Sequence, residues 1–286
     1  MAITNDVALI TFVPFAIETL RMARMEEKIV SVAVLQTVAA NLGSMVTPIG
    51  NPQNIYLYLQ SGMSTWDFLK VTGPFAVLAF VLLAGFSMAG RDKEIAFGKA
   101  PAAGGSAADE PIDRKVWIYA CEFIICIAAL TEYVPVMMVA LLCGAVAFII
   151  DRKTLLTVDY HLLLTFAGFF IFVGNMGRLP ALSQFISGVL EGSEVLVTAL
   201  VSQVISNVPA TILLTGFTDS WEALIIGSNI GGLGTLIASM ANLITYKYIN
   251  KECAHFRHAY VRWFTIMSVV FLAAEFLMYL VLYFVL

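Results

Sequence analysis

The sequence predicts an all-α polytopic membrane protein, and three observations support this fold class. Hydrophobic residues make up 60 % of the 286 residues and charged residues only 13 %, whereas soluble domains carry about 25 % charged residues. The mean hydropathy is +0.87, and several apolar runs reach the roughly 20 residues that a spanning helix needs. The alternating pattern of a membrane β-barrel is absent. We therefore expect the chain to lie in a lipid bilayer, with no nucleic-acid partner.

The first part of the chain, residues 1–90, contains three apolar segments. Residues 6–20 predict a short apolar helix. Residues 29–59 are long enough to span the membrane but contain a polar, glycine-rich interruption, and residues 66–90 form one continuous apolar run. A small, polar and unpatterned linker follows at residues 91–115, and this composition is typical of a flexible connection.

The second part, residues 116–286, predicts three spans followed by two irregular segments. The first irregular segment contains glycines and Ser206-Asn207-Val208-Pro209, and its two limbs are too short to cross the membrane singly, which favours a re-entrant hairpin. In order, the expected elements are spans at about 116–131, 134–150 and 160–176, the hairpin at 180–218, a broken span at 221–246 and a last span at 262–286.

A polar, glycine-rich stretch occurs twice inside these apolar segments, at Asn41–Asn54 and at Asn229–Asn242. The two copies align without a gap at an offset of 188 residues, which pairs Asn41 with Asn229, Gly43 with Gly231, Thr47 with Thr235 and Asn54 with Asn242. A shorter pair precedes them, because Thr4-Asn5-Asp6 matches Ser206-Asn207-Val208. Irregular backbone at membrane depth persists only where it lines a cavity, and matched interruptions in two halves indicate a transporter's binding site.

The positions of Lys and Arg predict how these segments cross the membrane. Of the 16 basic residues, all but Lys70 and Arg178 fall on one side of the layout. The positive-inside rule makes that side cytoplasmic, so we expect the linker in the cytoplasm and the C-terminus outside. The helix after Thr4 then returns to the cytoplasmic face, whereas the helix after Ser206 returns to the outer face. This opposition predicts an inverted-topology repeat with re-entrant hairpins and broken helices in the cytoplasmic (inner) membrane.

The two halves are unequal in length. About 90 residues precede Ser206 in the second half, counted from Val116, whereas three precede Thr4 in the first. We expect the chain to lack three spans and one hairpin limb at its N-terminus, because a start at a hairpin tip leaves helix ends unsupported. The alternatives are a natural half-size protein that borrows elements from a partner, and an inactive remnant or subunit.

The hairpin tips and the interruptions predict an ion and substrate site. Asn, Ser and Thr at helix starts expose oxygens while the first backbone N–H groups point outward, so tips that meet near the midplane attract both a cation and an anion. Glycines let the backbone unwind, Pro48 and Pro52 keep the helix open, and the absence of soft ligands favours Na⁺ over a transition metal. The candidate residues are Thr4, Asn5, Asp6, Asn41, Gly43, Ser44, Thr47, Gly50, Asn51, Asn54, Ser206, Asn207, Thr211, Asn229, Gly231, Gly232, Gly234, Thr235 and Asn242.

These motifs resemble the signature elements of the ion transporter superfamily, which includes citrate transporters, divalent-anion/sodium symporters, arsenite permeases and NhaD-type sodium/proton antiporters. The resemblance rests on Thr4-Asn5-Asp6, Ser206-Asn207-Val208 and the two interruptions, and it covers nearly the whole chain. It implies two hairpins whose tips, with the facing broken helices, bind Na⁺ and the carboxylates of a small anionic substrate. It also implies a homodimer through scaffold helices and an elevator-type movement of the hairpin domain.

The third tip position departs from the symporter pattern. It holds Asp6 in one half and Val208 in the other, where symporters usually carry Thr, and Asn5-Asp6 looks more like the arsenite and sodium/proton branches. A carboxylate at membrane depth is by default a functional hypothesis, so we expect Asp6 to contribute to ion coupling; a helix N-cap is the alternative. Interhelical pairing or interfacial solvation is expected for the other intramembrane acids, Glu18, Glu122, Glu132 and Glu275.

The predicted function is secondary active transport of a small anion, such as a di- or tricarboxylate, coupled to Na⁺ or H⁺. The alternatives within transport are sodium/proton exchange and arsenite export. A membrane enzyme would need a nucleophile–base pair or a metal set at membrane depth. All three histidines, His161, His255 and His258, lie at span edges or in loops, so we expect no enzyme, no catalytic residue and no cofactor besides the coupling ion.

Overall fold

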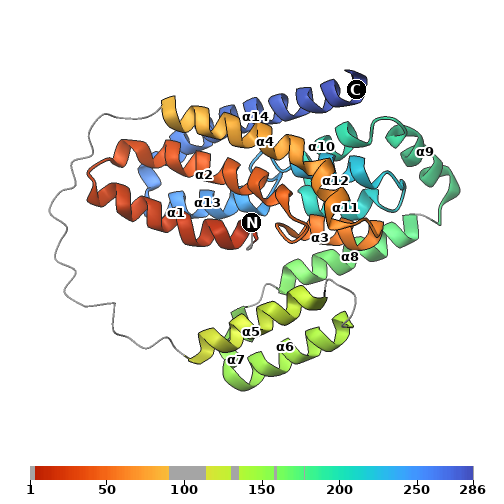
Figure 1. Ribbon diagram of the computed structural model, residues 1–286, viewed down its shortest axis with the longest axis horizontal. Coiled ribbons are helices and arrows are strands. Elements are labelled where there is room, and N and C mark those ends of the chain that lie inside the picture. The colour runs from red at the N-terminus through yellow and green to blue at the C-terminus, as the bar shows by residue number, and fades with distance from the viewer. Residues whose placement is uncertain (1–3, 90–113, 130–134, 158–159, 177, 286) are drawn as a thin grey trace. The chain divides into compact units, whose positions relative to one another are not determined.

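The computed structural model describes residues 4–89, 114–129, 135–157, 160–176 and 178–285, and these residues form helices without any strand (Figure 1). The all-α polytopic fold is therefore confirmed. The chain divides into two compact units, one made of residues 1–99 and 168–286 and the other of residues 100–167. The predicted linker at 91–115 lies outside the described residues, except for its last two positions.

The larger unit holds both interruptions. Its helices are α1 (Asn5–Met22), α2 (Ile29–Gly43), α3 (Pro52–Ser61), α4 (Thr65–Ala89), α9 (Pro180–Leu190), α10 (Glu194–Ile205), α11 (Asn207–Leu214), α12 (Trp221–Ile230), α13 (Met240–Glu252) and α14 (Arg257–Val285). Three single 3₁₀ turns join them, η1 (Glu26–Lys28), η2 (Ser44–Val46) and η3 (Ala254–Phe256). α2 lies beside α1 and α13, and α4 lies beside α14 (Figure 1).

The smaller unit contains two mainly apolar helices, α5 (Arg114–Ala129) and α6 (Val136–Ile150), and the short helix α7 (Arg152–Thr157). α5 and α6 pack together, and the Cys126 and Cys143 sulfur atoms lie 3.7 Å apart across this contact. The chain leaves this unit through α8 (Tyr160–Met176), whose second part belongs to the larger unit. The predicted spans at 116–131, 134–150 and 160–176 therefore correspond to α5, α6 and α8 over their described residues.

Both predicted interruptions break a helix in the structure, and the breaks match in register. α3 begins at Pro52 and α13 begins at Met240, which are equivalent positions at the offset of 188 residues. Asn51 caps α3, because its side-chain oxygen accepts a hydrogen bond from the Asn54 N–H, and Ser239 caps α13 by accepting from the Ala241 N–H. An N-cap oxygen satisfies one of the free donors at a helix start, so each break ends in a stable new helix.

The predicted hairpin at 180–218 has more than two helical limbs. It contains three helices, because the chain bends by 113° between α9 and α10 and then reverses again between α10 and α11. Ser206 alone joins α10 to α11, and its φ of +74° lies in the left-handed region. A non-glycine residue there costs about 1–3 kcal/mol and is maintained only by its surroundings, so the packing around the predicted tip holds Ser206 in this turn.

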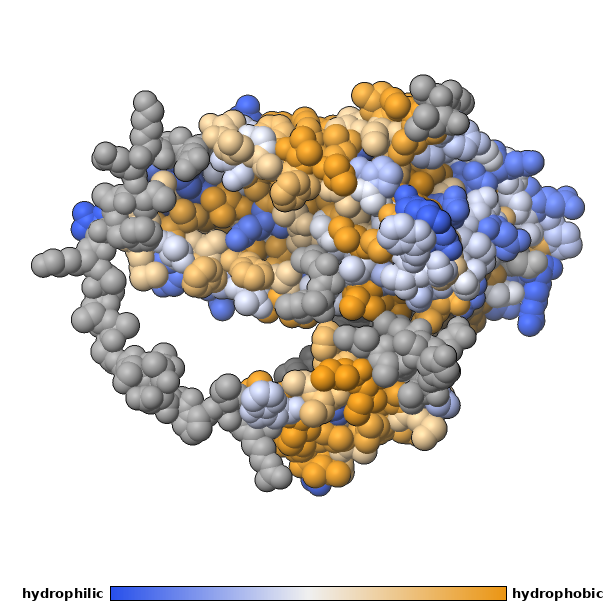
Figure 2. Space-filling model, viewed as in Figure 1, coloured by the Kyte–Doolittle hydropathy of each residue, from blue (hydrophilic) through white to orange (hydrophobic). Residues whose placement is uncertain are grey.

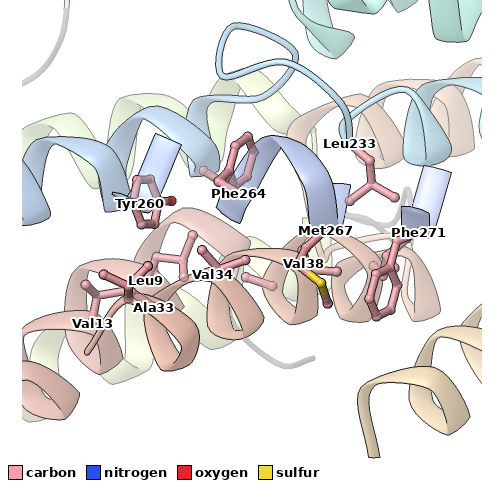
Figure 3. Close-up of a cluster of buried hydrophobic side chains, with 14 of the residues drawn as sticks. Leu9, Val13, Ala33, Val34, Val38, Leu233, Tyr260, Phe264, Met267 and Phe271 are labelled. Atoms are coloured by element: carbon pink, nitrogen blue, oxygen red, sulfur yellow. The ribbon is translucent and has the colours of Figure 1, made fainter. Parts of the chain in front are cut away.

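The core of the larger unit lies around α2. Among the described residues, three helical segments are long and apolar enough to cross a membrane, at 26–46, 65–89 and 254–283, and up to four if the bent pair of α9 and α10 forms one span. The most apolar part of the first is 61 % buried, against 17 % and 22 % for the other two. Leu9 and Val13 of α1, together with Tyr260, Phe264 and Phe271 of α14, cover α2 (Figure 3).

The two other candidate spans expose their apolar residues. Trp66, Val77 and Phe80 of α4, and Val269 and Leu277 of α14, are among the large hydrophobic side chains on the surface. Apolar residues dominate the visible surface along these two helices (Figure 2). Burial in lipid is the arrangement that satisfies such exposed apolar surface, so α2 is the protein-enclosed helix and α4 and α14 carry the lipid-facing surface.

Candidate functional site

Four asparagines from the two interruptions form a buried hydrogen-bonded cluster. The Asn41 amide nitrogen donates to Asn242 Oδ1 at 2.6 Å, and the Asn229 amide nitrogen donates to Asn54 Oδ1 at 2.7 Å. Asn51 joins the cluster, because its amide nitrogen donates to Asn229 Oδ1 at 3.1 Å. All five side chains are buried. The interruptions, 188 residues apart in the sequence, are thus in direct contact.

The contacts repeat with the symmetry of the sequence alignment. Asn41 is equivalent to Asn229, and Asn54 is equivalent to Asn242. The two short hydrogen bonds between the interruptions, Asn41–Asn242 and Asn229–Asn54, are therefore equivalent contacts. A second matched pair uses the backbone of the hairpin tips. The Asn5 N–H donates to the Gly50 carbonyl at 3.0 Å, and the Asn207 N–H donates at 2.9 Å to the carbonyl of Ala238, the equivalent of Gly50. Each tip is therefore attached to the interruption of its own half.

The first interruption is held in shape by Ser44 and Gly50. The Ser44 hydroxyl donates to the Asn41 carbonyl at 2.7 Å and accepts from the Asn51 amide at 3.0 Å. A Cβ on Gly50 would overlap the backbone of Ser44. Glycine is required here because no other residue permits this close approach of two backbone segments.

The second interruption is organised by Gln203, a residue that the sequence analysis missed. Its amide nitrogen donates to the carbonyls of Gly231 and Leu233 at 2.9 Å each, and its Oε1 accepts from the Thr235 N–H at 2.9 Å. Gly234, with a φ of +100°, leaves the room that the Gln203 side chain occupies. The available signal was a glutamine inside an otherwise apolar helix, three residues before the Ser206 tip.

Two glycines of the second interruption each permit a different close approach between chain segments. A Cβ on Gly231 would lie 2.8 Å from the Ser202 hydroxyl and 2.9 Å from the Ala199 Cα, so this glycine allows α12 to approach α10. A Cβ on Gly232 would lie 3.0 Å from Asn207 Nδ2 and 3.6 Å from Asn41 Oδ1. Gly232 therefore lets the Asn207 tip approach the interruption of its own half, and Asn41 of the first interruption lies in ordinary contact beside it.

Several predicted site residues use their polar atoms locally. Thr4 is the residue before α1, and its side chain makes no capping hydrogen bond. The Thr211 hydroxyl donates to the Asn207 carbonyl within α11, and the Thr235 hydroxyl donates to the Gln203 carbonyl. The following predicted residues shape the backbone: Gly43, which ends α2; Thr47, whose carbonyl accepts from the Gly50 N–H; and Ser206, the turn residue.

Two polar atoms at the site are buried without a hydrogen-bond partner. One is Oδ1 of Asp6, in the first turn of α1, and the other is the amide nitrogen of Asn54. A buried polar group without a partner costs about 1–3 kcal/mol, so these two atoms are candidates for contact with a ligand. An acceptor on a carboxylate suits a cation, and an amide donor suits an anion.

The other intramembrane acids have different surroundings. Glu18 pairs with Arg21 at 3.6 Å, but both residues belong to α1, so the pair lies within one helix rather than between helices. Oε1 of Glu122 is buried and has no hydrogen-bond partner, and Glu132 lies outside the described residues. Glu275 contradicts the expectation of pairing or solvation, because its side chain is fully buried and both of its oxygens lack a partner.

Comparison with known proteins decides the family. The sequence profile of a citrate transporter family matches residues 1–220, which include the first interruption and both hairpin tips. The chain belongs to this citrate transporter family. With its apolar helices, it is a multi-pass membrane protein, and the family points to a transporter rather than an enzyme.

Three relatives are named as membrane proteins or transporters. The chain is 35 % identical over 254 residues to the inner membrane protein YbiR of Escherichia coli, a match that covers 87 % of this chain and 66 % of that protein. It is 32 % identical over 255 residues to an uncharacterized transporter of Methanocaldococcus jannaschii, covering 87 % and 67 % respectively. An uncharacterized transporter of Mycobacterium bovis is 26 % identical over 262 residues, covering 77 % and 60 %. The chain thus spans about two thirds of the length of the curated relatives it matches.

Proposed function

We propose that this protein is a secondary active transporter of a small anion, a di- or tricarboxylate, coupled to Na⁺ or H⁺. The observation that carries this proposal is the buried asparagine cluster between the two interruptions. Amide side chains supply both donors and acceptors without a fixed charge. Such a site can bind a carboxylate and a cation together and can still cross the membrane interior after both have left.

The elements around the cluster support anion binding. α3 and α13 begin at equivalent positions in the two interruptions. The first N–H groups of each helix carry partial positive charge. The unpartnered amide of Asn54 adds a side-chain donor beside one of these helix starts. Together they offer neutral hydrogen-bond donors to a carboxylate from both halves.

The cation would use the oxygens of the same region. Asp6 supplies a buried carboxylate oxygen without a partner, and unwound backbone carbonyls are typical Na⁺ ligands in transporters built this way. A bound Na⁺ or proton offsets the charge of Asp6, and a bound substrate anion adds negative charge. We infer that each ligand strengthens the binding of the other, which is the basis of coupled symport.

Reconstituted uptake tests this proposal. We expect labelled citrate or a dicarboxylate to accumulate in proteoliposomes when a Na⁺ or H⁺ gradient is imposed, and we expect the Asn54→Ala variant to lose at least about tenfold in uptake, which corresponds to one lost hydrogen bond to a charged group. Asn250→Ala is the matched control, because Asn250 is exposed on α13. Accumulation that persists after both gradients are collapsed would refute coupled symport.

A second candidate is sodium/proton exchange, and it rests on Asp6. The carboxylate is half-buried with one oxygen enclosed, and its equivalent in the other half is the apolar Val208. If Na⁺ and H⁺ compete for this one carboxyl group, Asp6→Asn abolishes Na⁺-driven proton movement in vesicles without substrate. Under the symport proposal, substrate-free vesicles show no such movement, and Asp6→Asn changes the ion dependence of anion uptake instead.

A further inference from the structure

Glu275 lies within α14, and its carboxyl group is enclosed by the apolar core. Its side chain is 0 % exposed, and neither carboxyl oxygen has a hydrogen-bond partner among the described residues. Met267 and Phe271, which precede it on the same buried face, fill the core in that direction (Figure 3). The candidate transport site described above does not use this group.

Charged groups on the packed elements do not compensate Glu275. α2 carries none, and the two on α4, Asp67 and Lys70, are exposed at its start and pair with each other at 2.9 Å. The remaining titratable residues on the helices and the turn packed against α14, and on α14 itself, are Glu222, Tyr246, Lys247, Tyr248, Lys251, Glu252, His255, Arg257, His258, Tyr260, Arg262, Tyr279 and Tyr283. None of them makes a hydrogen bond or an ion pair with Glu275. Burying an unpaired carboxylate is far more costly than burying a neutral acid, so the surroundings of Glu275 suit a neutral carboxyl group better than an ionised one.

A water-accessible pocket opens one helical turn beyond Glu275. The cavity has a volume of about 570 Å³, and Tyr279 and Tyr283 of α14 line it together with Glu194, Asp219 and Glu222. Residues four apart lie on the same face of a helix, so Glu275, Tyr279 and Tyr283 form one stripe that leads from the core to the pocket. Tyr279 follows Glu275 by about one turn on this stripe, and its ring centre lies 5.6 Å from that of Tyr283, which also lines the pocket.

The surroundings of the pocket favour proton supply. Its three carboxylates concentrate protons and carry no neighbouring basic residue in its lining. Three residues of the connections at 60–65 and 217–220 line the pocket, namely Met63, Asp219 and Ser220. Neither connection contains lysine or arginine, so the positive-inside rule assigns both to the outer face. Water in the pocket therefore belongs to the outer side under that topology.

We propose that Glu275 is a proton-binding site of the transporter, which exchanges its proton with water in this pocket past Tyr279. The ligand is a proton rather than a metal ion, because a hard cation needs several oxygen ligands and no described oxygen makes a hydrogen bond to this carboxyl group. The role in coupling rests on the proposed transport function. Proton binding itself does not, and it can be measured without any substrate.

Infrared difference spectroscopy of the purified chain in lipid tests the proton site directly. We expect a protonated-carboxyl C=O band at neutral pH that is absent from Glu275→Gln, which keeps the size of the neutral acid, and that persists in Glu191→Gln, a change of an exposed glutamate. In D₂O the band shifts as the acid exchanges. Tyr279→Phe keeps the ring and removes the hydroxyl, and we expect it to slow this exchange, because the proton then passes between the pocket and the carboxyl group without that hydroxyl.

The outcomes separate this inference from the proposed function. A band that remains in Glu275→Gln overturns the proton site, and an unchanged exchange rate in Tyr279→Phe overturns the route. For the coupling role, we expect Glu275→Gln to lose the stimulation of anion uptake by an inward proton gradient while it keeps substrate binding. A Glu275-dependent band in a protein that transports no anion would refute the proposed function and leave the proton site standing.

Discussion

Asparagine side chains form the buried centre of this molecule, because a neutral amide can both donate and accept hydrogen bonds. Asn229 shows this use fully, since its oxygen accepts from Asn51 while its nitrogen donates to Asn54 and to the Ile225 carbonyl. A charged side chain in the same place would need a counter-charge to be tolerated at membrane depth. The amides instead hold the two halves together without adding a charge to this cluster.

Replacing Asn229 with alanine tests the cluster at the scale of one residue. The change removes the partner of Asn54 Oδ1 and one of the two acceptors of the Asn51 amide. Each buried group left without a partner costs about 1–3 kcal/mol, so we expect a lower melting temperature in detergent and loss of anion uptake. Asn250→Ala should change neither, because Asn250 is exposed. Equal melting temperatures for the two variants would show that the cluster does not stabilise the fold.

The interruptions depend on glycines at particular backbone positions, and this is a property of the element rather than of one contact. Gly50→Ala should prevent the first interruption from forming, because the new Cβ overlaps the Ser44 carbonyl oxygen and neither backbone can move away cheaply. Gly73→Ala is the matched control within α4, where nothing lies within 4 Å of the added atom. Chromatographic profiles of the two purified variants measure the difference. We expect a sharp monodisperse peak only for Gly73→Ala, and a normal peak for both contradicts the argument.

Gln203 connects α10 to the second interruption, so its removal should loosen that loop. Gln203→Ala deletes hydrogen bonds to Gly231, Leu233 and Thr235, which together hold the chain between α12 and α13. We expect faster amide hydrogen exchange over residues 231–235 and anion binding weakened about tenfold or more, in line with one or two lost hydrogen bonds. Gln60→Ala, an exposed change on α3, serves as the control. Unchanged exchange in both variants would mean that the glycine loop is held by other contacts.

The breaks in the helices were predictable from the sequence, because their causes are local. Asn51 and Pro52 combine an N-cap with a proline at the first helical position, a pattern that favours the start of a helix. The role of Gln203 and the full burial of Glu275 were not predictable in this way. Both depend on which helices become neighbours, and that information lies in tertiary packing rather than in the residues beside them.

The pairing of the interruptions also illustrates what an internal repeat predicts. An alignment at an offset of 188 residues identified equivalent asparagines, but it did not state that Asn41 would contact Asn242 rather than Asn229. A two-fold relation between the halves brings unlike positions of the two copies together, in the same manner as an isologous dimer interface. Such a relation maps the Asn41–Asn242 contact onto the Asn229–Asn54 contact, and the structure contains both.

At the scale of the whole molecule, the charge pattern predicts how the two halves lie in the membrane. The inverted arrangement predicts that the end of α1 faces the cytoplasm and the end of α11 faces the outside. Single cysteines at Glu26, just after α1, and at Asp219, just after α11, report on these two ends, and both native residues are exposed. The natural cysteines, Cys121, Cys126, Cys143 and Cys253, are first replaced by alanine or serine.

We expect a membrane-impermeant maleimide to label Asp219→Cys in intact cells, and to label Glu26→Cys only after the membrane is opened. The physical reason is the charge asymmetry, since lysine and arginine flank η1 whereas the connection at 217–220 has none. Labelling of both cysteines from the same side would show that the halves are parallel. The matched hydrogen bonds would then need a two-fold axis along the membrane normal, and the outer pocket beside Tyr279 would lose its assigned side.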